Sequence, residues 1–273
     1  MKKWWIIYDA ISNSKEYHNI IKFIVNTFSS KKIPFNLISN RKLTNNYLLH
    51  LQMTNQLPDI VLFWCKQDYA KKKFISNLGI TIINDYYESL ICENKYTQLK
   101  LLSRIPYLIP ETMFFDLHTF NNIIRNNNLS YPVVIKLNHS TLGNGVCIAN
   151  STEDINQFLL NNLKFNMNII MQEFLYFLPQ KVTKVCCYNG NILSCYSKNG
   201  SDLFKHSLTL KEKKLISKTI DTLNLNFCSI DLIYKSKHNP LICEVNNLPN
   251  ILTIFKITNI NIIEELINFY NNI

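Results

Sequence analysis

FCSIDLIYKSKHNPLICEVNNLP, residues 227–249, contains two apolar strands that each carry an acidic residue. Asp231 lies inside the first strand, and the second strand ends in Glu244, with Asn246 two residues later. Burying a carboxylate without a partner is costly, so acids embedded in apolar strands indicate a site rather than a structural role. Mg²⁺ takes carboxylate and other oxygen ligands together with phosphate oxygens and water. The stretch therefore predicts a magnesium site on two neighbouring strands.

Upstream of this stretch, residues 131–149 predict a β-hairpin with an unusual tip. The strand Tyr131–Lys136 ends in a lysine, and the loop Asn138–Gly145 contains hydroxyl side chains and two of the chain's five glycines. A loop of this composition can offer several backbone N–H groups to one anion. The alternative, a turn that needs glycine only for its positive φ, stays open at this point.

Strands and helices are also expected between these two segments. Ile169–Leu175 is an apolar strand that passes into polar residues, and Asn189-Gly190 is a strong hairpin signal between the strands Lys181–Tyr188 and Ile192–Ser197. A helix is predicted at Lys211–Leu223. The strand that carries Asp231 and the strand that carries Glu244 come after this helix.

The first third of the chain shows a different rhythm. Short apolar runs alternate with longer amphipathic stretches, as in a parallel sheet with crossover helices: Trp4–Tyr8, Ser14–Phe28, Phe35–Ile38, Ile60–Trp64, Tyr69–Leu78 and Ile80–Ile83. From Asp85 a helical stretch runs to Leu102, and prolines end it. A domain boundary is expected between residues 84 and 92.

Composition excludes several classes of protein. With 273 residues, 47% of them hydrophobic and 18% charged, the chain is neither disordered nor fibrous. No apolar run approaches the roughly 18 residues of a membrane span, and the apolar start closes on Asp9 without a cleavage site, which predicts a cytoplasmic protein with no membrane partner. The eight cysteines show no metal-binding spacing and are interpreted as reduced, buried thiols.

The net charge of +10 raises the question of a nucleic-acid partner. Nearly all the basic residues are scattered lysines, and arginine, the preferred reader of phosphates and base edges, occurs only three times. This distribution argues against nucleic acid. The run Lys71-Lys72-Lys73 is interpreted as a solvated helix face.

Taken together in this order and spacing, the motifs resemble the ATP-grasp superfamily, and within it the RimK-type and glutathione-synthetase-like carboxylate–amine ligases. The resemblance implies an α/β chain in which a Rossmann-like domain, residues 1–84, precedes an α+β ATP-grasp fold. Two subdomains would clasp ATP: a lid and linker subdomain, residues 85–171, and a C-terminal metal-binding subdomain, residues 172–273.

The resemblance also assigns roles residue by residue. Nucleotide contacts are expected from Lys95, Lys136, Ser140, Thr141, Gly143, Gly145, Gln172, Glu173, Phe174, Leu175 and Lys184. Asp231, Glu244 and Asn246 would hold Mg²⁺, with Mn²⁺ as an alternative ion, and Lys198 and Lys205 would be catalytic, stabilising the transferred phosphoryl group. The family's Asp-x-Arg, which contacts the ribose, is missing near Lys181–Val185, where Lys184 is the nearest cation. Pro249-Asn250 replaces the usual Pro-Gly, which implies a reshaped acceptor pocket.

The function implied is an ATP- and Mg²⁺-dependent ligase that joins a carboxylate to an amine, of an amino acid or a peptide, through an acyl phosphate. Two alternatives stay open. A looser resemblance around Gln172–Phe174 and Thr183–Val185 implies an inositol polyphosphate kinase, and the missing arginines leave room for a non-catalytic ATP-binding module. The oligomeric state, including a homo-oligomer, is left undetermined.

Overall fold

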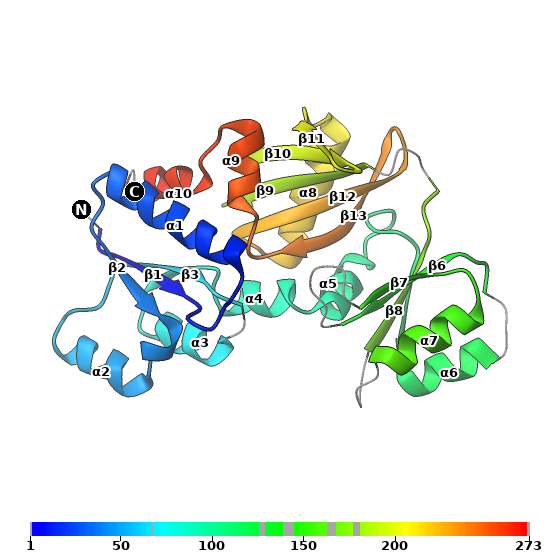
Figure 1. Cartoon of the computed structure of the whole chain (residues 1–273), viewed down its shortest axis with the longest axis horizontal. Helices are drawn as coiled ribbons and strands as arrows, with labels where there is room; N and C mark the ends of the chain where they lie inside the picture. Colours follow the sequence, from blue (N-terminus) through cyan, green and yellow to red (C-terminus); the bar gives the residue numbers. More distant parts are fainter. Residues whose placement is uncertain are drawn as a thin grey trace.

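The computed structural model describes residues 2–66, 68–125, 129–138, 145–162, 168–176 and 181–271. Within these ranges the strands form three sheets, one from each third of the chain (Figure 1). The predicted nucleotide residues Ser140, Thr141 and Gly143 lie outside the described residues.

The N-terminal sheet has the strand order β2-β1-β3-β4, and every pairing in it is parallel. Its elements are β1 (Trp4–Tyr8), α1 (Lys15–Ser30), β2 (Phe35–Ser39), the 3₁₀ helix η1 (Asn40–Lys42), α2 (Asn45–Met53), β3 (Ile60–Trp64), α3 (Tyr69–Asn77) and β4 (Thr81–Ile83). All five residues of β3 are buried, as expected for a central strand covered on both faces. The parallel sheet predicted for the first third is therefore present, and its Rossmann-like classification stays a prediction.

The middle sheet is antiparallel, with the order β5-β8-β6-β7. It comprises β5 (Thr112–Asp116), α6 (Leu117–Arg125), β6 (Val133–Leu137), β7 (Val146–Ala149), α7 (Thr152–Asn162) and β8 (Asn168–Glu173). Helices α6 and α7 lie together against one face of it (Figure 1). The predicted hairpin is confirmed by the pairing of β6 with β7, and its last loop residue, Gly145, has a φ of 82° that favours glycine.

The C-terminal sheet is antiparallel, with the order β11-β10-β9-β12-β13. Its elements are β9 (Lys181–Tyr188), β10 (Asn191–Asn199), β11 (Asp202–Lys205), α8 (Leu210–Leu223), β12 (Phe227–Ser236), β13 (Asn239–Asn246), α9 (Ile251–Thr258) and α10 (Ile262–Asn271). The hairpin predicted at Asn189-Gly190 is confirmed, and both residues have the positive φ that a two-residue turn requires. Helix α8 packs through Ile216 and Leu223 on the face formed by Val185 and Ile230. The opposite face, which carries Cys186 and Tyr196, packs in part against α9 and α10.

Two helices, α4 (Tyr86–Cys92) and α5 (Lys95–Leu102), connect the N-terminal sheet to the middle sheet (Figure 1). We predicted a single helical stretch here, but the structure breaks it at Glu93-Asn94. The cause is local, because the Asn94 side chain accepts a hydrogen bond from the Thr97 backbone N–H at 2.8 Å and so caps a new helix.

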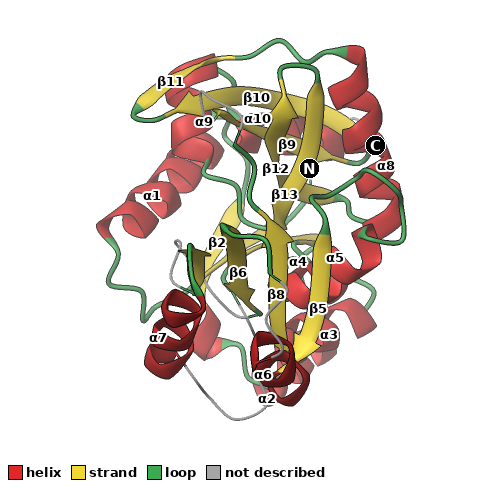
Figure 2. Cartoon of the chain, turned by 90° about the vertical axis from the view of Figure 1, so that its right-hand side faces the viewer, coloured by secondary structure: helices red, strands yellow, loops and turns green. Residues whose placement is uncertain are grey.

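The two ends of the chain share one hydrophobic core. Trp4 and Phe28 of the N-terminal sheet and α1 pack with Ile254 of α9 and Ile263 of α10, and the rings of Trp64 and Phe227 lie 6.2 Å apart. The termini lie side by side in both views (Figures 1 and 2). The N-terminal sheet is therefore held against the C-terminal sheet.

The charge and cysteine predictions have mixed outcomes. Lys73 is exposed as predicted, but Lys72 has 0% exposure, so the interpretation of the lysine run as a solvated face is wrong for Lys72. The eight cysteines are free thiols, and five of them are buried. In the part of the chain that the structure describes, no helix has both the length and the apolar character needed to cross a bilayer.

Candidate active site

The three predicted metal ligands come together on the face of the C-terminal sheet opposite α8. Asp231 on β12 is the register partner of Glu244 on β13, so their side chains share a face, and Asn246 follows on that face one step along the strand. The Asn246 amide nitrogen donates to Glu244 Oε1 at 3.2 Å. A β-bulge at Cys243 brings Glu244 into this register. The predicted cluster is thus formed by neighbouring strands.

Two lysines neutralise the two carboxylates. Lys184, the register partner of Asp231 on β9, donates to Asp231 Oδ2, and Lys95 Nζ lies 3.4 Å from Glu244 Oε2. Burial raises the pKa of Asp231 to about 6, although Lys184 opposes it. Burial also raises the pKa of Glu244, but the lysines, Lys95 foremost, outweigh burial and hold this pKa below its ordinary value.

The chemistry of this cluster fits a hard cation. Asp231 Oδ1 is buried and has no hydrogen-bond partner, which leaves one carboxylate oxygen available to a ligand. Among the described residues, no group of three or more His, Cys, Asp or Glu side chains gathers, so a closed zinc site is not found there. Two carboxylates and an amide suit an ion such as Mg²⁺, which fills its remaining positions with water and phosphate oxygens.

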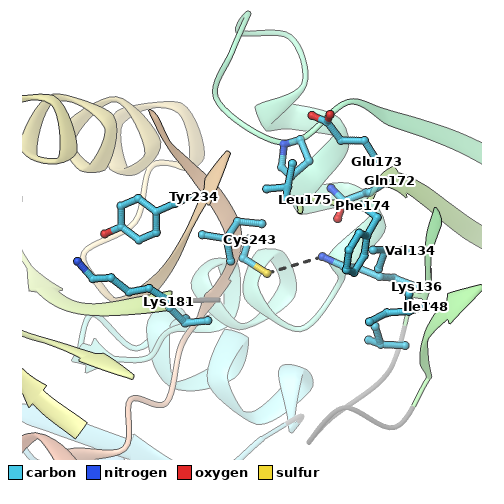
Figure 3. Close-up of a pocket in the computed structure, with 14 residues that line it drawn as sticks. Val134, Lys136, Ile148, Gln172, Glu173, Phe174, Leu175, Lys181, Tyr234 and Cys243 are labelled. Atoms are coloured by element: carbon cyan, nitrogen blue, oxygen red, sulfur yellow. Dashed lines mark hydrogen bonds between the residues drawn. The ribbon is translucent and has the colours of Figure 1, made fainter. Parts of the chain in front are cut away.

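A pocket of about 280 Å³ lies between the middle sheet and the C-terminal sheet (Figure 3). Its walls are mainly apolar, from Val134 and Ile148 on one side to Ile233 on the other. Five predicted nucleotide residues line it, namely Lys136, Gln172, Glu173, Phe174 and Leu175. An apolar slot with a few polar groups is typical of a small-ligand site, and we call it the nucleotide pocket.

The polar side chains of the nucleotide pocket are held by defined contacts. Lys136 is buried and its Nζ lies 3.8 Å from Cys243 Sγ, which brings the ammonium group next to the strand that carries Glu244 (Figure 3). Gln172 donates to Thr112 Oγ1 at 2.8 Å. The Glu173 carboxylate accepts from Lys235 Nζ at 2.7 Å and from a backbone N–H of the adjoining loop at 3.1 Å, so it ties the two walls of the pocket together.

Helix α5 positions Lys95 at the junction of both sheets. Lys95 is the first residue of α5, and the next backbone N–H, that of Tyr96, donates to Asn138 Oδ1 at 3.0 Å at the end of β6. One turn later the buried Gln98 side chain pairs with Val245, donating to its carbonyl at 2.7 Å and accepting from its N–H at 2.8 Å. This amide therefore fixes α5 to the edge of β13, between Glu244 and Asn246.

The predicted catalytic lysines lie further away. Lys205 on β11 continues the register row of Tyr196, Lys184 and Asp231, and Lys198 lies on the same face of β10. Both lysines are exposed. Two or three strand spacings separate them from β12, about 10–14 Å. They share the face of the metal cluster without contacting it, and their catalytic role stays a prediction.

A second pocket, of about 210 Å³, opens on the other side of the metal cluster. It is lined by Lys184, Tyr196, Ser229, Asn246 and the segment Leu248–Asn250, among others. Sequence reasoning flagged Pro249-Asn250 but missed Tyr196 and Ser229. Their positions, two residues before Lys198 and Asp231 on their strands, place them on the same face and were a usable signal.

Similarity to known proteins agrees with this geometry. Residues 92–270 match the model of the RimK-like ATP-grasp domain, and this range contains all the predicted metal ligands. The chain belongs to the RimK-like ATP-grasp family. Its enzyme class is that of the family's ATP-dependent carbon–nitrogen ligases, and the resemblance drawn from the motifs is confirmed.

Among curated relatives, a probable alpha-L-glutamate ligase of Legionella pneumophila is 24% identical over 214 residues, covering 73% of this chain and 70% of the relative. Probable alpha-L-glutamate ligase 1 of Shewanella frigidimarina is 27% identical over 205 residues, covering 70% and 67%. Among solved structures, a RimK domain ATP-grasp protein from Sphaerobacter thermophilus superposes with a TM-score of 0.72 at 12% identity, covering 98% of both chains. The ATP complex of D-alanine–D-alanine ligase from Bacillus anthracis gives 0.69 at 18% identity, covering 92% and 87%. These two structures support the fold.

Proposed function

We propose that this RimK-like ATP-grasp enzyme uses ATP and Mg²⁺ to join a carboxylate to an amine through an acyl phosphate. The observation that carries the proposal is the unpartnered Asp231 Oδ1 in a cluster with Glu244 and Asn246. Along β13, Glu244 lies between Cys243, which lines the nucleotide pocket, and Asn246, which lines the second pocket. Terminal phosphates and a carboxylate substrate would meet there.

The reaction needs activation because a carboxylate does not acylate an amine at neutral pH. Transfer of the γ-phosphoryl group to the carboxylate oxygen releases ADP and forms the acyl phosphate. The amine then attacks the acyl carbon, loses a proton and expels phosphate. Positioning and charge neutralisation supply most of the catalysis of such a transfer.

Each part of the site has a proposed task. The backbone around Phe174 and Leu175 would hold the base in the nucleotide pocket, and Lys136 and Lys95 would neutralise the phosphates. Asp231, Glu244 and Asn246 would hold Mg²⁺, which neutralises charge on the phosphate oxygens. The division of the chain at residues 84 and 171 is kept as part of this proposal.

We further propose that one substrate is an anionic amino acid, with glutamate the first to test. Lys184, paired with Asp231, lines the second pocket beside Tyr196 and Ser229. The exposed Lys198 and Lys205 add positive charge along the same face. A carboxylate side chain would find complementary charge there. The names of the curated relatives point to the same amino acid.

Trapping with hydroxylamine tests this function. An acyl phosphate reacts with hydroxylamine to give a hydroxamate, whereas the phosphate ester left by a kinase does not. Incubation with ATP, Mg²⁺, glutamate and hydroxylamine should release one ADP per hydroxamate, and Lys198→Ala combined with Lys205→Ala should lower hydroxamate formation more than ATP binding. In a parallel incubation with an inositol polyphosphate in place of glutamate, a hydroxylamine-resistant phosphorylated product would establish the kinase instead. ATP binding without turnover on any acceptor would establish the binding module.

A further inference from the structure

Lys72 on α3 is a buried lysine outside the proposed site. Its side chain has 0% exposure, although its sequence neighbour Lys73 is exposed on the same helix. A buried ammonium group is costly unless it is paired and hydrogen-bonded. The contacts of Lys72 therefore indicate what its burial achieves.

The Lys72 ammonium group is bound from several elements. Nζ donates to Ser89 Oγ on α4 and to the carbonyl oxygen of Cys65 after β3 at 3.4 Å, and it lies 4.8 Å from the centre of the Phe63 ring. Burial lowers the pKa of Lys72, and the carboxylate of Glu93 at the end of α4 opposes this shift. Lys72 thus fixes α4 to the N-terminal sheet.

The Ser89 hydroxyl also connects Lys72 to the end of β13, the strand that carries Glu244 and Asn246. Ser89 Oγ accepts a second hydrogen bond, at 3.1 Å, from the side-chain amide of Asn247. That amide also donates to Glu93 Oε1 at 3.2 Å, and Asn247 is 3% exposed. Asn247 directly follows Asn246, so a displacement of its backbone displaces the proposed metal ligand as well.

We propose that Lys72 is a positioning residue that sets the place of Asn246 in the metal cluster through Ser89 and Asn247. The inference rests on the proposed function, because it gives Asn246 a metal to hold. Lys72 is not among the residues that line either of the two described pockets. Groups that support metal ligands from outside commonly change metal affinity or activity by about 10- to 100-fold when they are removed.

The test is Mn²⁺ binding to the protein–ADP complex by calorimetry, beside ADP binding without metal and the steady-state rate. Lys72→Met removes the ammonium group and keeps most of the side-chain volume. It should weaken Mn²⁺ binding about tenfold and lower kcat by a similar factor, while metal-free ADP affinity stays within about twofold because the nucleotide pocket is formed elsewhere. Lys73→Met, the matched control with the same charge change, should leave all three quantities unchanged.

A second variant defines the route and guards against misfolding. Ser89→Ala removes the shared hydroxyl and should weaken Mn²⁺ binding as well. If both residues act on one path, the double variant with Lys72→Met should bind Mn²⁺ no more weakly than the single variant with the lower affinity. Should Lys72→Met not fold, Ser89→Ala alone decides. Unchanged Mn²⁺ affinity in the folded variants overturns the inference, whereas a wild-type protein that binds no Mn²⁺ with ADP overturns the proposed metal site itself.

Discussion

Asp231 has two carboxylate oxygens in different surroundings. Oδ2 accepts a hydrogen bond from Lys184, while Oδ1 is buried without a partner. Such a group is destabilising for the isolated protein and becomes favourable once a cation completes it. The metal cluster is therefore formed at a cost to stability, which a metal complex would reverse.

Removal of a metal ligand should affect turnover more than folding. Glu244→Ala and Asn246→Ala should each abolish ATP turnover, since Mg²⁺ has few protein ligands here, while the thermal midpoint changes by only a few degrees because both side chains are half-buried. Coupled ADP assays and calorimetric melting measure the two effects, with the exposed Glu153→Ala as control. Turnover that persists in both variants contradicts the metal assignment.

Lys136 should contribute to nucleotide affinity. Its ammonium group lines the nucleotide pocket beside Cys243. We expect Lys136→Met to raise the ATP dissociation constant at least about tenfold, or ~1.4 kcal/mol, in a calorimetric titration. The exposed Lys256→Met controls for the loss of one positive charge, and equal constants for the two variants would place the phosphate site elsewhere.

At the scale of elements, the side chain of Gln98 completes part of one sheet edge. β13 is the edge strand of the C-terminal sheet, and the buried Gln98 amide takes the place of a further strand by satisfying both backbone groups of Val245. This contact joins the helix that begins with Lys95 to the strand that carries Glu244. It explains how two distant segments keep one geometry.

The loss of the contact between Gln98 and Val245 should lower the free energy of unfolding. Gln98→Leu would leave the N–H and the carbonyl of Val245 buried without partners, and each such group costs about 1–3 kcal/mol. Urea denaturation should show a loss of about 2 kcal/mol or more, with Lys100→Ala on the exposed face of the same helix as control. A loss equal to the control's would contradict the clamp.

Helix α8 begins with a capping box whose acid is buried. Glu212 accepts hydrogen bonds from Tyr234 Oη, from the Thr209 backbone N–H at 2.7 Å and from its hydroxyl at 2.8 Å, and its carboxylate lies 3.0 Å from His206 Nε2. Burial raises the pKa of Glu212, but these hydrogen bonds, that of Tyr234 first, outweigh it and hold the pKa below its ordinary value.

This depressed pKa predicts an acid-side loss of stability. The carboxylate is stabilised in the folded state, so its contribution is complete above the unfolded pKa near 4.5 and is lost as the pH falls through the lower folded pKa. Unfolding free energies measured from pH 7 to pH 3 should fall less steeply below pH 5 for Glu212→Gln than for the wild type. Parallel curves would show that Glu212 does not titrate with folding.

At the scale of the whole molecule, the C-terminal sheet is joined to both of the other sheets. The nucleotide pocket has walls from the middle and C-terminal sheets, and the N-terminal sheet shares its core with α9 and α10. Lys72 and Ser89 link the N-terminal sheet to Asn247, the residue that follows β13. A nucleotide that fills the pocket therefore contacts both of its walls.

Nucleotide with metal should stabilise the folded chain. Binding to the folded state alone adds about 2.7 kcal/mol when the free ligand is 100 times its dissociation constant. Thermal melting should rise by several degrees with ATP and Mg²⁺, and chelation of the metal should remove part of the rise. A melting midpoint that is unaffected by saturating ATP and Mg²⁺ would contradict a pocket formed by both sheets.

The sequence by itself determined the elements whose signals are local. The Asn189-Gly190 hairpin, the parallel rhythm of the first third and the acids within residues 227–249 depend on neighbours along the chain and on the two-residue period of strands. The same period brought Asp231 and Glu244 to one face. The family and its fold followed from these motifs because their order is a property of the sequence.

Only the tertiary structure decided which side chains face inward and meet across elements. The sequence predicted Lys72 to be part of a solvated run, but in the fold it is buried among Ser89, Cys65 and Phe63. Nothing in the sequence indicated that Gln98 pairs with a strand almost 150 positions away. The distance of Lys198 and Lys205 from β12 likewise came from the strand order. The physical reason is that burial and partnership arise from packing between segments remote in sequence, which no local pattern records.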